Sequence, residues 1–118
     1  MVRIWIIAAG LGGLAAVALG AAMTHLGWDP TLLEIAARYM MYHSLALLAV
    51  ALLAKGGADW PLQLAGWCFL FGMIGFSGGL VLKAATGWAW ATASTPVGGT
   101  LFMLGWLGLA IHGMRRGA

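Results

Sequence analysis

Four long apolar stretches, separated by only a few polar residues each, constrain the fold of this chain more than any other feature. They lie at about residues 3–26, 30–54, 61–86 and 96–113. A helix needs about 20 mostly apolar residues to cross the hydrocarbon core of a bilayer, and every stretch is long enough. Only 8% of the 118 residues are charged, against roughly a quarter in soluble domains. We therefore predict an all-α membrane protein.

Capping residues mark the ends of the predicted helices. The letters WDP place Asp29 as the cap of the second helix and Pro30 at its first position. Gly87 is suited to end the third helix, and the letters STP offer Ser94 or Thr95 as the cap of the fourth. Because the connections are short, neighbouring helices must run antiparallel. Residues 1–118 are predicted to form one domain, an antiparallel four-transmembrane-helix bundle.

The positive charges predict the orientation of this bundle. Short cytoplasmic segments of membrane proteins carry an excess of lysine and arginine. In the predicted topology four of the six basic residues share the end that holds both termini, and two lie at the opposite end: Arg3, Lys55, Arg115 and Arg116 against Arg38 and Lys83. We expect a multi-pass protein of the bacterial cytoplasmic (inner) membrane with both termini in the cytoplasm.

The positions of the tryptophans support the same helix boundaries. Its amphipathic ring prefers the interface between membrane and water. Five of the seven tryptophans fall at predicted helix ends: Trp5, Trp28, Trp60, Trp88 and Trp90. Trp67 and Trp106 lie deeper and are expected to be packing residues.

Nineteen glycines make the helices slim, which in lipid allows close helix packing. Two stripes are expected to pack helices together, one on the third helix and one on the fourth: Gly72, Gly75 and Gly79, with Gly98, Gly105 and Gly108. Such stripes serve either a tight four-helix monomer or a surface for another membrane subunit, and the sequence leaves both open.

The predicted topology gathers polar side chains at the end opposite the termini. Helix two carries Glu34 four residues before Arg38, the favourable order for an ion pair, and Tyr39 four residues before His43. Polar residues within the membrane are expensive and are expected to face the bundle interior. All four helices contribute to this candidate polar cluster: His25, Glu34, Arg38, Tyr39, Tyr42, His43, Ser77 and Thr95.

His43 has several possible roles. It could bond a hydroxyl of a neighbouring helix, Ser77 or Thr95, and so hold helices together. It could instead belong to a site for a quinone, a lipid headgroup or another small molecule. Haem ligation by His25 and His43 is disfavoured because their predicted depths differ. Two histidines alone also make a poor metal site, since structural sites use four ligands and catalytic ones usually three.

Several function classes are excluded by missing residues. Cys68 is the only cysteine, so no disulfide or paired-thiol chemistry is expected. Neither a Ser-His-Asp set nor a phosphate-binding loop is present in the sequence. The net charge of +3 comes from too few residues to indicate nucleic-acid binding. We expect no enzyme, no cofactor and no bound metal.

Four segments resemble a known family. "GAAMTH" at 20–25, "YMMYHSLALL" at 39–48, "FSGGL" at 76–80, and "TPVGG" with "FMLGW" at 95–106 match its motifs in order and spacing. The family is known as domain of unknown function 423, whose eukaryotic relatives are called transmembrane protein 256 homologues. This chain departs from the family pattern at Met23, Met40 and Gly79, where the family has glycine, glutamine and serine. The resemblance implies a four-helix inner-membrane protein and supplies no activity.

Two functions are compatible with these observations. Small loops and glycine stripes favour an accessory or scaffold subunit that packs against a larger membrane complex or a second copy. The alternative is binding or transport of a small or lipid-like molecule, a quinone or a lipid, at the polar cluster.

Overall fold

The computed structural model describes residues 2–116, and residues 1, 117 and 118 of the predicted domain lie outside this range. The helices are α1 (Val2–His25), α2 (Pro30–Ala54), α3 (Trp60–Thr86) and α4 (Thr95–Arg116), with a short 3-10 helix, η1 (Ala89–Ser94), before α4. All four long helices are long and apolar enough to cross a membrane. The predicted all-α, antiparallel four-helix fold is confirmed.

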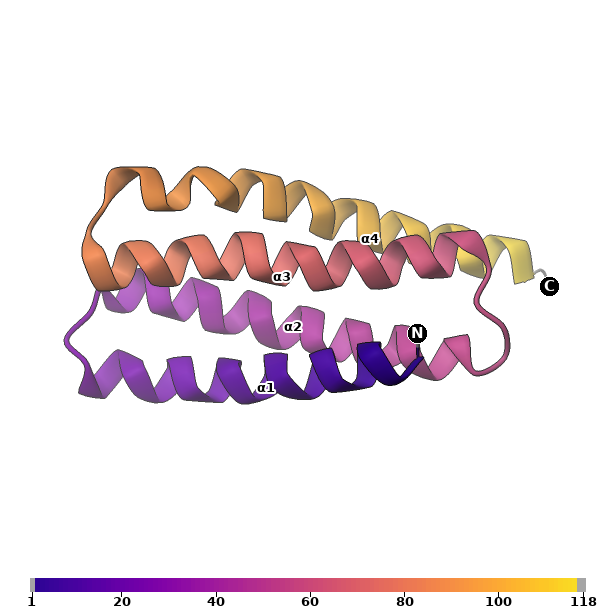
Figure 1. Ribbon diagram of the computed structural model, residues 1–118, viewed down its shortest axis with the longest axis horizontal. Coiled ribbons are helices and arrows are strands. Elements are labelled where there is room, and N and C mark those ends of the chain that lie inside the picture. The colour runs from indigo at the N-terminus through magenta and orange to yellow at the C-terminus, as the bar shows by residue number, and fades with distance from the viewer. Residues whose placement is uncertain (1, 117–118) are drawn as a thin grey trace.

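Successive helices are neighbours in space. α1 packs on α2, α2 on α3 and α3 on α4, whereas α1 and α4 share no extensive contact within residues 2–116. Both termini and the α2–α3 connection lie at one end, here called the terminal end (Figure 1). The α1–α2 and α3–α4 connections lie at the other, the connection end. The molecule is 49 Å long, enough to reach both headgroup layers of a bilayer about 40–45 Å thick.

The capping residues act as local chemistry requires. The carboxylate of Asp29 accepts from the amides of Thr31 at 3.0 Å and Leu32 at 3.3 Å. Pro30 follows at the first helical position, where its missing N–H costs nothing. At the end of α3, Gly87 adopts a left-handed conformation with φ of 74° and its amide donates to the Lys83 carbonyl.

The start of α4 differs from the sequence prediction. Neither Ser94 nor Thr95 caps this helix, because η1 runs directly into α4 and leaves no free turn at the junction. Both hydroxyls donate instead across to α3, Ser94 to the Gly75 carbonyl at 2.9 Å and Thr95 to the Phe76 carbonyl at 3.3 Å. They therefore hold two helices together rather than starting one. At its other end α4 continues to Arg116, past the predicted end at Gly113.

Glycine brings the backbones of α3 and α4 into contact. A Cβ atom on Gly98 would lie 2.2 Å from the Phe76 amide nitrogen and 2.8 Å from the Gly72 carbonyl oxygen, closer than any side chain allows. The six predicted packing glycines all lie along this contact, facing α3, α4 or η1. Both predicted stripes are thus used inside the chain.

Trp5 is placed differently from the sequence prediction. The ring was expected at the membrane interface, yet it is fully buried between α1 and α3. Gly66 makes the space, since a Cβ there would lie 2.3 Å from the indole. The Trp5 indole nitrogen is the one buried side-chain polar atom without a hydrogen-bond partner in the described residues. Burial of the large apolar ring against a glycine outweighs the lost hydrogen bond.

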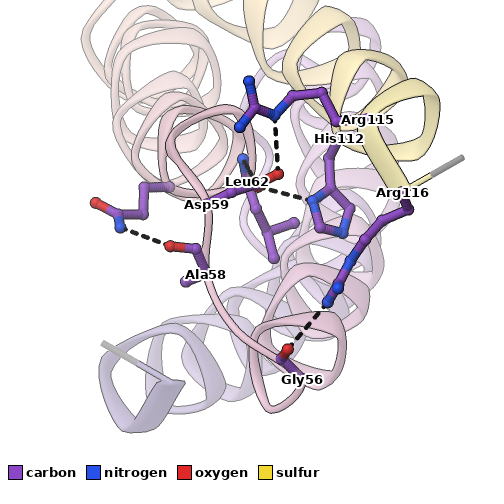
Figure 2. A network of polar contacts seen from close by, with 8 residues as sticks. Gly56, Ala58, Asp59, Leu62, His112, Arg115 and Arg116 are labelled. Atoms are coloured by element: carbon purple, nitrogen blue, oxygen red, sulfur yellow. Dashed lines mark hydrogen bonds and ion pairs between the residues drawn. The ribbon is translucent and has the colours of Figure 1, made fainter.

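A network of polar contacts fastens the terminal end (Figure 2). Asp59 caps α3 by accepting from the Leu62 amide, and the same carboxylate accepts from Nδ1 of buried His112 at 2.7 Å. Arg115 reaches its other oxygen at 3.4 Å, and Arg116 donates to the Gly56 carbonyl at 3.0 Å. These contacts, here called the latch, join the last turns of α4 to the α2–α3 connection.

The latch sets the ionisation of Asp59. Its partial desolvation opposes the charged form, but the hydrogen bonds from His112 and Leu62 and the charges of His112 and Arg115 outweigh this. The pKa of Asp59 is therefore held below its ordinary value. A carboxylate of lowered pKa stabilises the fold above its unfolded pKa, and this contribution is lost as the pH falls through the folded value.

We expect Gly98→Ala to destabilise the protein by roughly 1–3 kcal/mol, because α3 and α4 must separate to admit the methyl group. The matched control is Gly10→Ala, whose Cβ would meet nothing within 4 Å. Reversible unfolding in mixed micelles, followed by circular dichroism, measures both variants. Equal effects of the two substitutions would show that the α3–α4 contact is not tight.

Asp59→Asn should lower the thermal unfolding midpoint at pH 7 while preserving the cap, since asparagine is also a good N-cap. The gap to the wild type should begin to narrow as the pH falls below the ordinary aspartate pKa of about 3.9, and should close only as the pH falls through the lowered pKa of folded Asp59. Unfolding scans from pH 7 to pH 3 test this. The control Asp29→Asn alters the other capping aspartate and should lower the unfolding midpoint much less. An equal decrease in the midpoint for both variants would show that the Asp59→Asn effect comes from helix capping and not from the latch.

Candidate functional site

His43 lies at mid-height on α2, buried among aromatic rings. Its imidazole stacks on Phe102 of α4 with ring centroids 3.5 Å apart and planes 7° apart. Trp106, one turn further along α4, points its indole N–H at Nε2 of His43 at 3.1 Å. α2 and α4 therefore meet through side chains rather than through backbone contact.

The hydrogen bonds fix the protonation pattern of His43. An indole N–H can only donate, so Nε2 must be an acceptor without a proton. Nδ1 carries the proton and donates to the Tyr39 carbonyl oxygen at 2.6 Å. The ring is a neutral imidazole with both nitrogens engaged. It pairs with Trp106, and the predicted partners Ser77 and Thr95 bond elsewhere.

A groove opens beside this ring, between α2 and α4. Its volume is about 510 Å³, within the roughly 300–1,000 Å³ range of small-molecule sites. We call it the aromatic groove, and its lining is mostly apolar: Tyr39, Tyr42, His43, Leu45, Gly99, Phe102, Met103 and Trp106. Gly99 leaves it open, since a Cβ there would only touch the Phe76 ring at 3.7 Å.

The two tyrosines supply the free polar groups of the groove. Tyr39 and Tyr42 are 37% and 54% exposed, and their rings lie 6.1 Å apart. Neither hydroxyl takes part in a hydrogen bond found among residues 2–116. Because both nitrogens of His43 are occupied, the phenol groups are the available donors for a bound molecule.

The remaining residues of the predicted polar cluster do not join this groove. Glu34 and Arg38 form an ion pair on the exposed face of α2, and His25 is exposed at the end of α1. Ser77 is fully buried and donates to the Ala36 carbonyl at 3.0 Å, which holds α3 to α2. The structure thus divides the cluster into an exposed pair, hydroxyls that join helices, and an aromatic groove.

The geometry argues against a haem held by His25 and His43. Along an antiparallel pair His43 lies about 13 residues beyond the α1–α2 connection, or about 20 Å at 1.5 Å per residue. In the described residues no group of three or more His, Cys, Asp or Glu side chains is placed to hold a metal ion.

Phe102, Met103 and Trp106 were missed as site residues by the sequence reasoning. A signal existed, because Phe102 and Trp106 are four residues apart and so share one face of α4. The pairing with His43 depends on how α4 is rotated, which the glycine contact with α3 determines. Sequence spacing within one helix does not contain that information.

The Trp106–His43 bond should be measurable as a coupling energy. A double-mutant cycle of Trp106→Phe and His43→Leu is expected to give about 0.5–2 kcal/mol, because each single variant leaves one polar atom within the membrane-spanning helices without its hydrogen-bond partner. Trp106→Phe combined with Ser77→Ala is the control and should be additive within about 0.5 kcal/mol. Unfolding free energies in mixed micelles give both values, and no excess coupling in the first cycle would refute the bond.

A family model described as "Protein of unknown function (DUF423)" matches residues 11–99 of this chain. The match covers α1 beyond its first turns, α2, α3 and the start of α4. It confirms the resemblance seen in the sequence motifs. No solved structure matches the chain.

Bacterial membrane proteins match nearly the whole chain. A UPF0382 membrane protein of Staphylococcus epidermidis is 37% identical over 92% of this chain and 93% of its own length. A UPF0382 membrane protein of Haemophilus influenzae is 39% identical over 85% of this chain and 85% of its own length. The UPF0382 membrane protein YwdK of Bacillus subtilis is 31% identical over 96% of this chain and 98% of its own length. With four helices able to span a bilayer, this chain is an integral membrane protein and belongs to the DUF423 family of proteins of unknown function.

Proposed function

We propose that this protein binds the apolar part of a membrane amphiphile, a lipid or a quinone, in the aromatic groove. The observation that carries the proposal is the open, mostly apolar hollow of about 510 Å³ between α2 and α4. It lies among the membrane-spanning segments, where the ligands at hand are themselves largely apolar. Its walls offer flat rings and flexible Met103, surfaces suited to hydrocarbon chains and to conjugated ring systems.

The polar groups of the groove limit how such a molecule would be oriented. His43 is engaged on both ring nitrogens. The hydroxyls of Tyr39 and Tyr42 remain to bond a carbonyl or ester oxygen. The expected ligand therefore places its hydrogen-bonding group toward the tyrosines and its apolar body against Phe102 and Trp106. This arrangement supports binding rather than catalysis, because both nitrogens of His43 are already hydrogen-bonded and the described residues that line the groove include no carboxylate, lysine or cysteine.

An accessory-subunit role is the second candidate, and it has one supporting observation. The glycine stripes that suggested it are taken up by contacts inside the chain. α1, however, packs mainly on α2 and leaves an outer face with Gly10, Gly13 and Gly20 open and Leu14 67% exposed. A partner helix would therefore dock on α1, away from the aromatic groove.

Photolabelling tests the groove. Proteoliposomes containing a diazirine-bearing phospholipid or a photoreactive quinone analogue are irradiated, and the labelled peptides are mapped by mass spectrometry. We expect saturable labelling of Tyr42 and Met103 that an excess of unlabelled ligand displaces. Gly99→Phe fills the groove and should lower this labelling about tenfold, while Gly20→Phe, on the open face of α1, should leave it unchanged.

The outcomes separate the two candidates. Labelling spread evenly over exposed residues such as Leu11 and Leu14, without saturation, would reveal only bulk lipid and refute the groove. Labelling by one of the two probes alone identifies the ligand class. Native mass spectra of the same preparations report on the accessory role, which a second polypeptide of fixed stoichiometry supports and a lone chain contradicts.

A further inference from the structure

We propose that the terminal end carries a binding site for a phosphate group, formed by Arg115 and Arg116 beside the α2–α3 connection. The site is a hollow of about 650 Å³, here called the basic hollow, lined by Gly56, Gly57, Ala58, Asp59, Arg115 and Arg116. It shares no lining residue with the aromatic groove. The proposal therefore stands independently of the function proposed above.

One wall of the basic hollow is almost bare backbone. Gly56 and Gly57 lie in the connection just after the end of α2, and neither has a side chain to fill the space. Gly57 has φ of 112°, a conformation that favours glycine, and a Cβ there would meet nothing within 4 Å. The hollow is larger than a phosphate group requires, so the groups esterified to a phosphate also fit.

The opposite wall offers unused hydrogen-bond donors. Each guanidinium has five N–H groups in a planar fork that matches phosphate oxygens. Among the described residues Arg115 is engaged through Nε with Asp59, and Arg116 through one Nη2 contact with the Gly56 carbonyl. In Figure 2 the Arg115 side chain reaches Asp59 and the Arg116 side chain reaches Gly56, and each guanidinium keeps N–H groups that take part in no contact found among the described residues.

The charge of the hollow favours an anion. Among the described residues that line it, Asp59 is the one carboxylate, and it is already paired with His112 and Arg115. The two arginines outnumber that carboxylate, and Lys55 adjoins Gly56 along the chain. Asp59 therefore acts to orient Arg115 rather than to cancel the positive potential.

The depth of the hollow indicates where the phosphate comes from. Trp60 is 57% exposed at the start of α3, and the Arg115 guanidinium lies 5.9 Å from the centre of its ring. An exposed tryptophan at a helix end marks the headgroup layer, the layer that holds phospholipid phosphates. Basic pockets between transmembrane helices bind anionic headgroups. The ligand class is thus a phosphate ester of an anionic phospholipid, or free phosphate with the same chemistry.

Native mass spectrometry in mild detergent tests the site with phosphatidylglycerol and phosphatidylcholine of identical acyl chains. The wild type should retain phosphatidylglycerol preferentially. Arg115→Gln with Arg116→Gln should lower that preference by about fivefold for each arginine, or about 25-fold for both. The matched control, Arg38→Gln with Lys83→Gln, removes the same charge at the connection end and should keep the preference. Inorganic phosphate added to the lipid-bound protein distinguishes the sources, since displacement of the lipid by millimolar phosphate points to a free-phosphate site.

Two further variants separate binding from folding. Arg115→Lys with Arg116→Lys preserves the charges and should retain most of the preference. Asp59→Asn leaves both arginines but releases Arg115 from the latch, and should lower the preference less than the paired glutamine variant does, because only the preorganisation of Arg115 is lost. The proposal is overturned if the wild type prefers neither anionic lipid nor phosphate, if the glutamine variant keeps the preference, or if the connection-end control loses it equally.

Discussion

The backbone contact between α3 and α4 is the constraint on which the rest of this structure depends. In lipid no hydrophobic force draws two helices together, so association relies on close packing and hydrogen bonds between helices. Gly98 lets α4 approach until only a hydrogen fits against the Phe76 amide. The hydroxyls of Ser94 and Thr95 reach α3 carbonyls because the backbones are that close. The position and rotation of α4 follow from this contact.

The same contact creates the aromatic groove. Because α4 lies tightly on α3, it reaches α2 only through long side chains, chiefly Phe102 and Trp106 against His43. At this depth an indole N–H and an imidazole nitrogen each lack water, and each satisfies the other. The histidine that looked most like a reactive group in the sequence is therefore a neutral structural acceptor. Its neighbours leave the hollow that a ligand would occupy, with the tyrosine hydroxyls as its donors.

The sequence predicted what local chemistry and the bilayer determine. Span length and composition gave four antiparallel helices, and Asp29, Pro30 and Gly87 act at helix ends as their chemistry requires. The candidate site was predicted only in part. Topology places polar residues at one end of the bundle, but helix rotation decides which of them meet. Hence Tyr39, Tyr42 and His43 line the groove, while Arg38 and His25 are exposed and Glu34 is half-buried beside Arg38. The prediction for Trp5 was wrong because Gly66 on α3 leaves space for its ring, and the sequence of α1 does not reveal that space.

Charged residues have different structural roles at the connection end and the terminal end, because different segments of the chain meet at each end. At the connection end Glu34 and Arg38 both lie on α2, so their ion pair does not join two helices. At the terminal end α4 is held to the α2–α3 connection by the contacts of His112 with Asp59 and of Arg116 with the Gly56 carbonyl. A latch made of arginines and a carboxylate keeps the arginine side chains extended and oriented before any ligand arrives. Such preorganisation lowers the entropic cost of binding, so the contacts that fasten α4 also prepare the basic hollow for an anion.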